Sequence, residues 1–192
     1  RQIAHRTEDV GRAKTDSSGR AVRAINPDVA LELHNVRLDP GNARDLIARY
    51  DIVADGSDNF ATRFLVNDTC YFVGRTLISA AVTEFDGQLA TFKAHDKSGA
   101  WPCYRCIFPV PPPPGAVPSC SEAGVLGAAA GVMGTLQALE VLKEILGIGE
   151  SLAGQLLIYD ALATRFRKVT VRPDPACPLC GTNPTIRSVG AA

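Results

Sequence analysis

The sequence predicts an α/β fold in which helices flank a mixed sheet and zinc pins the end of the chain to its middle. Short apolar segments typical of strands alternate with longer helical patterns from residue 51 onward. Two C-x-x-C knuckles, Cys103/Cys106 and Cys177/Cys180, offer the four thiolates that a closed tetrahedral zinc site needs. The knuckles lie far apart, so they predict a long-range clamp.

The cysteine pattern leaves alternatives open. The same residues could form a disulfide or have unrelated roles, and a redox C-x-x-C would need only one pair at the start of a helix. Prolines beside both knuckles favour turns that direct the sulfurs to a shared point. These prolines are Pro102, Pro109, Pro175 and Pro178.

Length, net charge and cysteine content exclude several classes of protein. At 192 residues the chain can form one domain with a sizeable core. Its formal net charge of +0 argues against a nucleic-acid partner. No apolar run reaches the roughly 18 residues of a membrane span, and the first residues do not form a signal peptide. Six cysteines, four of them in two paired knuckles, fit metal binding in a reducing cytoplasm.

The N-terminal part predicts a polar segment over residues 1–14, whose charges face solvent, and a helix over 11–25. Ser17-Ser18-Gly19 weakens this helix and Asn26-Pro27 ends it. Alternating apolar residues over 29–38 predict a half-buried strand, followed by a short helix over 43–50.

A short apolar strand then runs into the turn Asp55-Gly56-Ser57-Asp58-Asn59, and a helix is expected over 60–74. Ligands of open α/β sheets bind at the carboxyl ends of strands, which makes Asp58 and Asn59 candidate binding residues. Asp58 could instead serve only as a helix N-cap.

Residues 76–94 predict a β-hairpin with a type I′ turn at Asp86-Gly87, which makes the sheet mixed. An irregular crossover follows over 101–118. Two further strands are expected at 156–160 and 167–171.

The clearest helical pattern covers residues 119–147. Ser119-x-x-Glu122 fits a capping box, and apolar residues around the circumference predict a buried helix. Its first half is rich in Gly and Ala, which suits either a symmetric dimer contact or close packing within one subunit.

Two cysteines remain outside the knuckles. If the capping box is right, Cys120 lies in the first helical turn, where the helix dipole lowers a thiol pKa and favours a nucleophile. If the helix starts at Gly124 instead, Cys120 lies in a loop without that effect. Cys70 is expected to be inert core.

Several motifs in this order resemble the MoeB/ThiF family, whose members are related to ubiquitin-activating enzymes and adenylate the C-terminal glycine of sulfur-carrier proteins. The resemblance covers residues 1–186 as an adenylation domain of Rossmann-like fold and leaves 187–192 as a tail or linker. Besides the two knuckles, the matching motifs are Arg1-Gln2, Gly11-x-x-Lys14, Ile25-Asn26-Pro27, Asp55-Gly56-Ser57-Asp58-Asn59, Cys120-x-Glu122-Ala123-Gly124-Val125-Leu126-Gly127 and Gln137-Ala138-x-Glu140.

The resemblance implies roles for individual residues. Arg1 and Lys14 match the basic pair on the ATP phosphates, Asp58 the acid that holds Mg²⁺, and Asn59 its neighbour at the nucleotide. Cys120 matches the catalytic-cysteine position. The residues that match the structural zinc ligands are Cys103, Cys106, Cys177 and Cys180.

The implied activity is ATP-dependent adenylation of a ubiquitin-like sulfur carrier before thiocarboxylate formation, in the cytoplasm, by a homodimer with a rhodanese domain or another sulfur donor. The family's N-terminal strand and Gly-rich nucleotide loop do not precede Arg1, so this chain is expected to lack that half of the pocket. Two alternatives are a zinc-stapled scaffold that docks a carrier without activating it, and an ATP-independent sulfurtransferase that uses Cys120.

Overall fold

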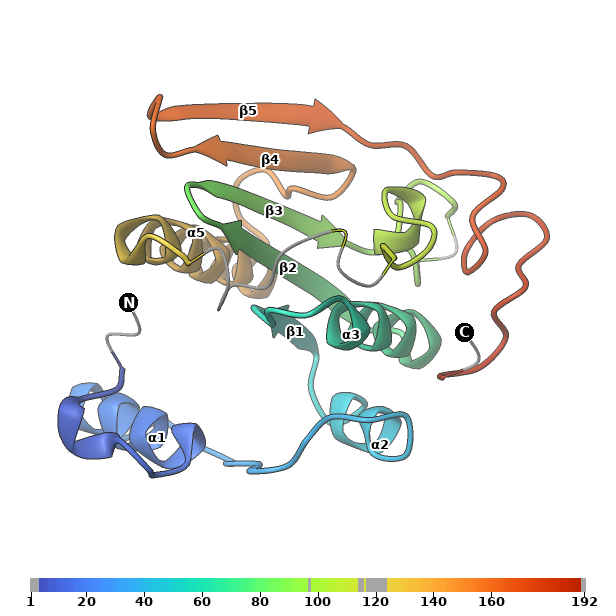
Figure 1. The fold of residues 1–192 in the computed structure, drawn as a ribbon. Coiled ribbons are helices and arrows are strands. Elements are labelled where there is room, and N and C mark those ends of the chain that lie inside the picture. The colour runs from blue at the N-terminus through green and yellow to red at the C-terminus, as the bar shows by residue number, and fades with distance from the viewer. Residues whose placement is uncertain (1–3, 97, 114–115, 117–123, 191–192) are drawn as a thin grey trace. The chain divides into compact units, whose positions relative to one another are not determined.

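The computed structural model describes residues 4–96, 98–113, 116 and 124–190. The chain divides into two compact units, Arg1–Leu38 and Asp39–Ala192. Figure 1 shows the second unit as a twisted sheet with helices packed on it. Each unit has its own internal contacts.

The first unit contains the 3₁₀ helix η1 (Thr7–Asp9) and the helix α1 (Lys14–Ile25), which confirms the helix expected there. Buried Asp9 accepts a hydrogen bond from the backbone N–H of Arg6 at 2.9 Å and pairs with Arg20 of α1. The backbone bond, followed by Arg20, lowers the pKa of the Asp9 carboxyl. This carboxylate therefore ties η1 to α1.

The strand predicted over residues 29–38 is wrong, because this segment forms no ladder. Its apolar side chains are largely exposed: Val36 is 61% accessible. Leu33 packs against Gly19 of α1, where an added Cβ would lie 2.7 Å from the Leu33 Cδ1 atom. The alternation indicates an extended chain that contacts a helix, since alternation alone does not supply a neighbouring strand.

The second unit is built on a five-stranded sheet with the order β1-β2-β3-β4-β5. β1 and β2 are parallel, and all other pairs are antiparallel, so the prediction of a mixed sheet flanked by helices is confirmed. The strands are β1 (Ile52–Asp55), β2 (Thr76–Thr83), β3 (Asp86–Phe92), β4 (Gln155–Asp160) and β5 (Arg165–Thr170).

The predicted hairpin forms, but its turn lies earlier than the Asp86-Gly87 signal indicates. Thr83 pairs with Asp86, so Glu84 and Phe85 form the turn and Glu84 takes a positive φ of 34°. Asp86 and Gly87 are already in β3. Gly87 is needed there for space, because an added Cβ would lie 2.5 Å from the Met133 Sδ atom.

The second unit has three described α-helices: α2 (Ala43–Ile47), α3 (Phe60–Val73) and α5 (Gly127–Leu146). α3 and α5 pack on the sheet, and α2 packs on α3. α3 begins at an Asn59 cap, whose side chain accepts a hydrogen bond from Thr62 N at 2.9 Å. The alternative of Asp58 as the N-cap is therefore wrong. α3 ends at Gly74 with φ 72°, a conformation that glycine adopts readily.

α5 covers one face of the sheet. Met133 and Ala129 of α5 pack with Ile78 and Leu89 in a buried apolar cluster. The helix begins later than predicted, at Gly127 with Leu126 as its N-cap, because residues 124–126 are not helical. The expected capping residues Ser119 and Glu122 lie outside the described residues.

The prediction that α5 is buried all round is also wrong. Only Ala129, Met133 and Glu140 are buried, whereas Leu139, Leu142 and Ile145 are 53%, 51% and 62% accessible. Positions 131 and 134 have open space where a side chain would project, so their glycines do not serve close packing within the described chain. No helix in the described ranges is long and apolar enough to cross a membrane.

The contrast between two glycines predicts opposite stability effects. Gly87→Ala should lower the free energy of unfolding by about 1–3 kcal/mol, because its Cβ would force buried Met133 to move. Gly131→Ala should raise it by up to about 1 kcal/mol, because alanine favours the helix and meets no atom there. Urea unfolding of both variants checks the pair, and equal effects would contradict the packing described at Gly87.

Candidate functional site

The four knuckle cysteines meet at one point. Their sulfurs all lie within 4.8 Å of one another. Cys103 lies 3.6 Å from Cys177 and 3.4 Å from Cys180, and Cys106 lies 3.4 Å from Cys180. Sulfurs about 2.3 Å from a central zinc ion would lie about 3.8 Å apart, so this set has the spacing of a tetrahedral four-cysteine site that could hold zinc.

The environment of the sulfurs suits a metal more than a disulfide. All cysteines of the described chain are free thiols. Hydrogen bonding to Cys106, and then to Cys177 and Cys180, raises the pKa of Cys103, whereas bonds from Cys103 and Cys106 lower the pKa of Cys177. A cation at the centre would favour the thiolate form of all four. The backbone N–H of Asp174 donates to Cys106 Sγ at 3.4 Å, an outer contact that orients a ligand.

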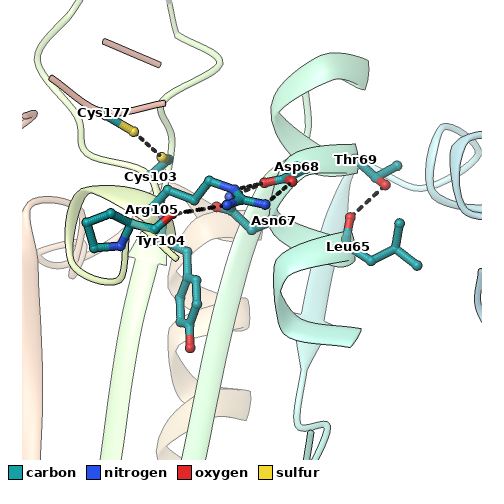
Figure 2. Close-up of polar contacts among 9 residues, drawn as sticks. Leu65, Asn67, Asp68, Thr69, Cys103, Tyr104, Arg105 and Cys177 are labelled. Atoms are coloured by element: carbon teal, nitrogen blue, oxygen red, sulfur yellow. Dashed lines mark hydrogen bonds and ion pairs between the residues drawn. The ribbon is translucent and has the colours of Figure 1, made fainter. Parts of the chain in front are cut away.

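The first knuckle is also anchored to α3, independently of the sulfurs. Arg105, which is 2% accessible, makes a two-pronged ion pair with Asp68: its Nε and NH2 groups donate to Oδ1 and Oδ2 at 2.8 and 2.7 Å (Figure 2). The backbone N–H of Tyr104 donates to Asn67 Oδ1 at 2.9 Å. Such forked, buried pairs impose a defined geometry.

The side chain of Tyr104 points away from Cys103, as Figure 2 shows, and it packs among aromatic rings. Its ring meets Phe64 edge-on at 5.2 Å and Phe92 at 5.9 Å between centroids, and it lies 4.9 Å from Phe108. Burial raises the pKa of its hydroxyl, and the Arg63 guanidinium opposes this rise. The turn between the first two sulfurs, η2 (Tyr104–Cys106), thus supplies one wall of an adjoining pocket.

The pocket has a volume of about 210 Å³ and lies on the face of the sheet opposite α5. Small side chains of β2 and β3, including Ser79, Ala81 and Ala90, line its floor. Arg63 and Asp58, from the start of α3 and the turn before it, provide charged groups at its wall. A mainly apolar groove with a few charged groups is typical of a ligand site.

The turn after β1 holds Asp58 beside this pocket. Buried Asp55 accepts a hydrogen bond from Ser57 N at 2.9 Å through its Oδ1 atom, and Arg63 donates to the carbonyl of Ser57. Asp58 and Asn59 are exposed, and Asn59 Nδ2 lies 3.4 Å from Asp58 Oδ1. The structure therefore brings together Asp58, Asn59 and the carboxyl end of a strand, as the pattern predicts.

The remaining predicted site residues lie in the first unit or outside the described residues. Lys14 is exposed at the start of α1 in the first unit. Arg1 and Cys120 lie outside the described residues, so the expected position of the Cys120 thiol in a first helical turn stays a prediction. Cys70 is 2% accessible in α3, and burial raises its pKa to about 12, as expected for an inert core thiol.

Three features of this site were not predicted from the sequence: the residues between Cys103 and Cys106, the side chain of Arg63, and the ion pair of Arg105. Tyr104 and Arg105 could have been noticed, because they lie between two metal-ligand candidates. Arg63 lies four residues after Asn59, the N-cap of α3, a spacing that places both on the same side of the helix start. No local signal pairs Arg105 with Asp68, because the two residues lie 37 positions apart.

Residues 1–179 match the ThiF family. The chain belongs to the ThiF family. It is 52% identical over 192 residues to the "Sulfur carrier protein adenylyltransferase" of Thermus thermophilus, covering 98% of this chain and 70% of that protein. It is 45% identical over 178 residues to the "Probable adenylyltransferase/sulfurtransferase MoeZ" of Mycobacterium tuberculosis, covering 93% of this chain and 45% of that protein.

Solved structures support the same fold. Escherichia coli MccB, in a crystal structure with ATP, superposes with a TM-score of 0.76 at 18% identity, over 94% of this chain and 54% of MccB. The prediction of the MoeB/ThiF family is therefore confirmed, as is that of an enzyme of the sulfur-carrier adenylyltransferase type. The names of the relatives do not favour the non-catalytic scaffold or the ATP-independent sulfurtransferase.

The four-cysteine cluster predicts that the protein binds zinc and that its thermal stability depends on the bound ion. Cys180→Ser should abolish stoichiometric zinc binding and lower the melting temperature, because a closed zinc site needs all four thiolates. Cys70→Ala, which removes a thiol outside the cluster, should keep the zinc. Metal content measured by mass spectrometry checks both variants. Zinc should also bind more weakly as the pH falls, because protons compete for the sulfurs; zinc retained by Cys180→Ser would contradict the assignment.

The buried ion pair predicts a large stability cost. Arg105→Met should lower the free energy of unfolding by about 3–5 kcal/mol, because Asp68 is left charged and buried without its partner. Adding Asp68→Leu should recover most of this loss, since neither charge then remains. As a control, Asp51→Asn breaks the exposed Arg75–Asp51 pair and should cost at most about 1 kcal/mol. Chemical unfolding measures all three, and a loss at Arg105 as small as the control's would show that the pair contributes little.

Proposed function

We propose that this chain forms the adenylation part of an ATP-dependent enzyme that activates the C-terminal carboxylate of a ubiquitin-like sulfur-carrier protein. The observation that carries the proposal is the ThiF-family match over residues 1–179, together with relatives named as adenylyltransferases of such carriers. The pocket beside Asp58 supports it, because it adjoins the carboxyl end of a strand, where open α/β sheets bind ligands.

In the proposed reaction, a terminal carboxylate oxygen of the carrier forms a bond to the α-phosphorus of ATP, and the bond to pyrophosphate breaks. The products are an acyl-adenylate and pyrophosphate. Arg1 and Lys14 stabilise the negative charge of the triphosphate as pyrophosphate leaves. Asn59 lies at the nucleotide, with its side-chain oxygen already committed to the α3 cap.

Asp58 is proposed to hold Mg²⁺. Magnesium in nucleotide sites is bound by one or two carboxylates together with phosphate oxygens, and exposed Asp58 at the start of α3 offers such a carboxylate. When bound, the ion would neutralise charge on the phosphate oxygens. The role of Asp58 is to orient the nucleotide so that its α-phosphorus faces the pocket.

The pocket is proposed to take the flexible end of the carrier. Its floor of Ser79, Ala81 and Ala90 leaves room for a backbone with small side chains, as in a tail that ends in glycine. Tyr104 and Phe108 form an apolar wall against which such a tail can lie. The zinc clamp then serves this site indirectly, because it holds the turn that carries Tyr104.

After adenylation, a sulfur nucleophile displaces AMP and leaves a thiocarboxylate on the carrier. Cys120 is proposed to relay this step: its thiolate displaces AMP and forms a thioester with the carrier, and a sulfide-level nucleophile then displaces the Cys120 thiolate and leaves the thiocarboxylate. A rhodanese domain or another sulfur donor would supply the sulfur. The enzyme is proposed to act in the cytoplasm as a homodimer, which the exposed apolar residues of α5 support because a second copy would bury them.

Pyrophosphate exchange tests the proposal. With ATP and a cognate carrier, Asp58→Ala should lower the exchange rate about 10²–10³-fold, as expected when a group that stabilises developing charge is removed. Asp51→Asn, which alters a fully exposed acid side chain at the opposite end of β1, should leave the rate unchanged. An inactive wild-type protein would contradict the proposed adenylation activity. An Asp58→Ala variant as active as the control would contradict the role of Asp58.

A further inference from the structure

The motif Gln137-Ala138-x-Glu140 in α5 makes a specific contact with the sheet. The side-chain amide of Gln137 donates to the carbonyl oxygens of Asp55 and Ile78, each at 2.9 Å. A primary amide has two N–H groups, so one side chain can satisfy both carbonyls. Asp55 ends β1 and Ile78 lies in β2, so Gln137 bridges the two parallel strands.

This bridge lies directly before the turn that carries Asp58. The carbonyl that Gln137 binds belongs to Asp55, the last residue of β1. From the other face of the sheet, Arg63 of α3 donates to the Ser57 carbonyl and, at 3.5 Å, to the Ala80 carbonyl. The turn is therefore held by hydrogen bonds from α5 on one side and α3 on the other.

Glu140, one helical turn after Gln137, holds α5 in register. It is 2% accessible, and its Oε1 atom accepts hydrogen bonds from Thr91 Oγ1 at 3.0 Å and from Leu152 N at 2.6 Å. Lys143 pairs with its Oε2 atom. Because residues three apart share a helix face, this buried anchor prevents Gln137 from sliding along the strands.

We infer that Gln137 is a positioning residue for Asp58: its amide fixes the carboxyl end of β1 and thereby the turn from which Asp58 reaches the pocket. The inference rests on the proposed function for its catalytic consequence. Without the amide, two carbonyls lose a shared donor and the turn relaxes. A displacement of about 1 Å in a catalytic group can cost about 10²-fold in rate.

Three variants of the whole protein separate this role from general packing. Gln137→Met keeps the length of the side chain but cannot donate, and Gln137→Glu keeps its shape but places acceptors against two carbonyls. Thr135→Ala is the matched control, because exposed Thr135 lies in the same helix and bonds only within it, to the Gly131 carbonyl.

Two measurements are made on each variant. Amide hydrogen exchange of the segment 56–59 requires no activity and should be faster in both Gln137 variants than in Thr135→Ala. In pyrophosphate exchange with ATP and carrier, the kcat of Gln137→Met should fall about 10- to 100-fold, whereas Thr135→Ala should match wild type. The melting temperature is recorded to separate these effects from a general loss of fold.

Wild-type protection of residues 56–59 in Gln137→Met would overturn the positioning role, whatever the activity. Unchanged kcat in Gln137→Met, with an active wild-type protein, would overturn it as well. An inactive wild-type protein combined with faster amide exchange in the Gln137 variants would instead overturn the proposed function, while the structural bridge would stand.

Discussion

The convergence of four cysteines is the constraint on which the rest of the second unit depends. Cys177 and Cys180 meet the first knuckle, which the Arg105–Asp68 pair holds beside α3. Four close thiolates repel one another unless a cation lies among them, so a bound metal would convert this cluster into a stabilising one. Leu179 and Ile186 complete a small apolar cluster around the sulfurs.

The same short turn links stability to the candidate site. Its sulfurs face the metal position, Arg105 faces α3, and Tyr104 faces the pocket. Tyr104, between two of the four cysteines, is held by the hydrogen bond from its backbone N–H to Asn67 and by the aromatic rings packed around it. On the opposite side, the start of α3 supplies Arg63 and the preceding turn supplies Asp58. In the proposed function, support from two directions would help to orient a flexible peptide end against a nucleotide.

Elements whose cause lies in nearby residues could be predicted from the sequence. The strand before Asp55 and the helix after Asn59 follow from apolar runs and capping chemistry, and the structure confirms both. Elements that depend on a partner distant in the sequence could not be predicted correctly. The alternation over 29–38 resembles a strand, but a strand needs a partner. Asp86-Gly87 predicted the hairpin turn, but both residues lie in β3, where the strand register places Gly87 against Met133.

Sequence alone determined the four cysteines of the candidate metal site, the acidic turn after β1 and the family, because each depends on residue types at short spacings or in a specific order. Only the tertiary structure decided that the knuckles meet, that Arg105 is paired with Asp68, and that Gln137 bridges two strands. These contacts join residues far apart in the chain, and a hydrogen bond or ion pair forms only when folding brings its two groups within about 3 Å. The spacing of residues along the chain does not predict which of these distant groups will meet.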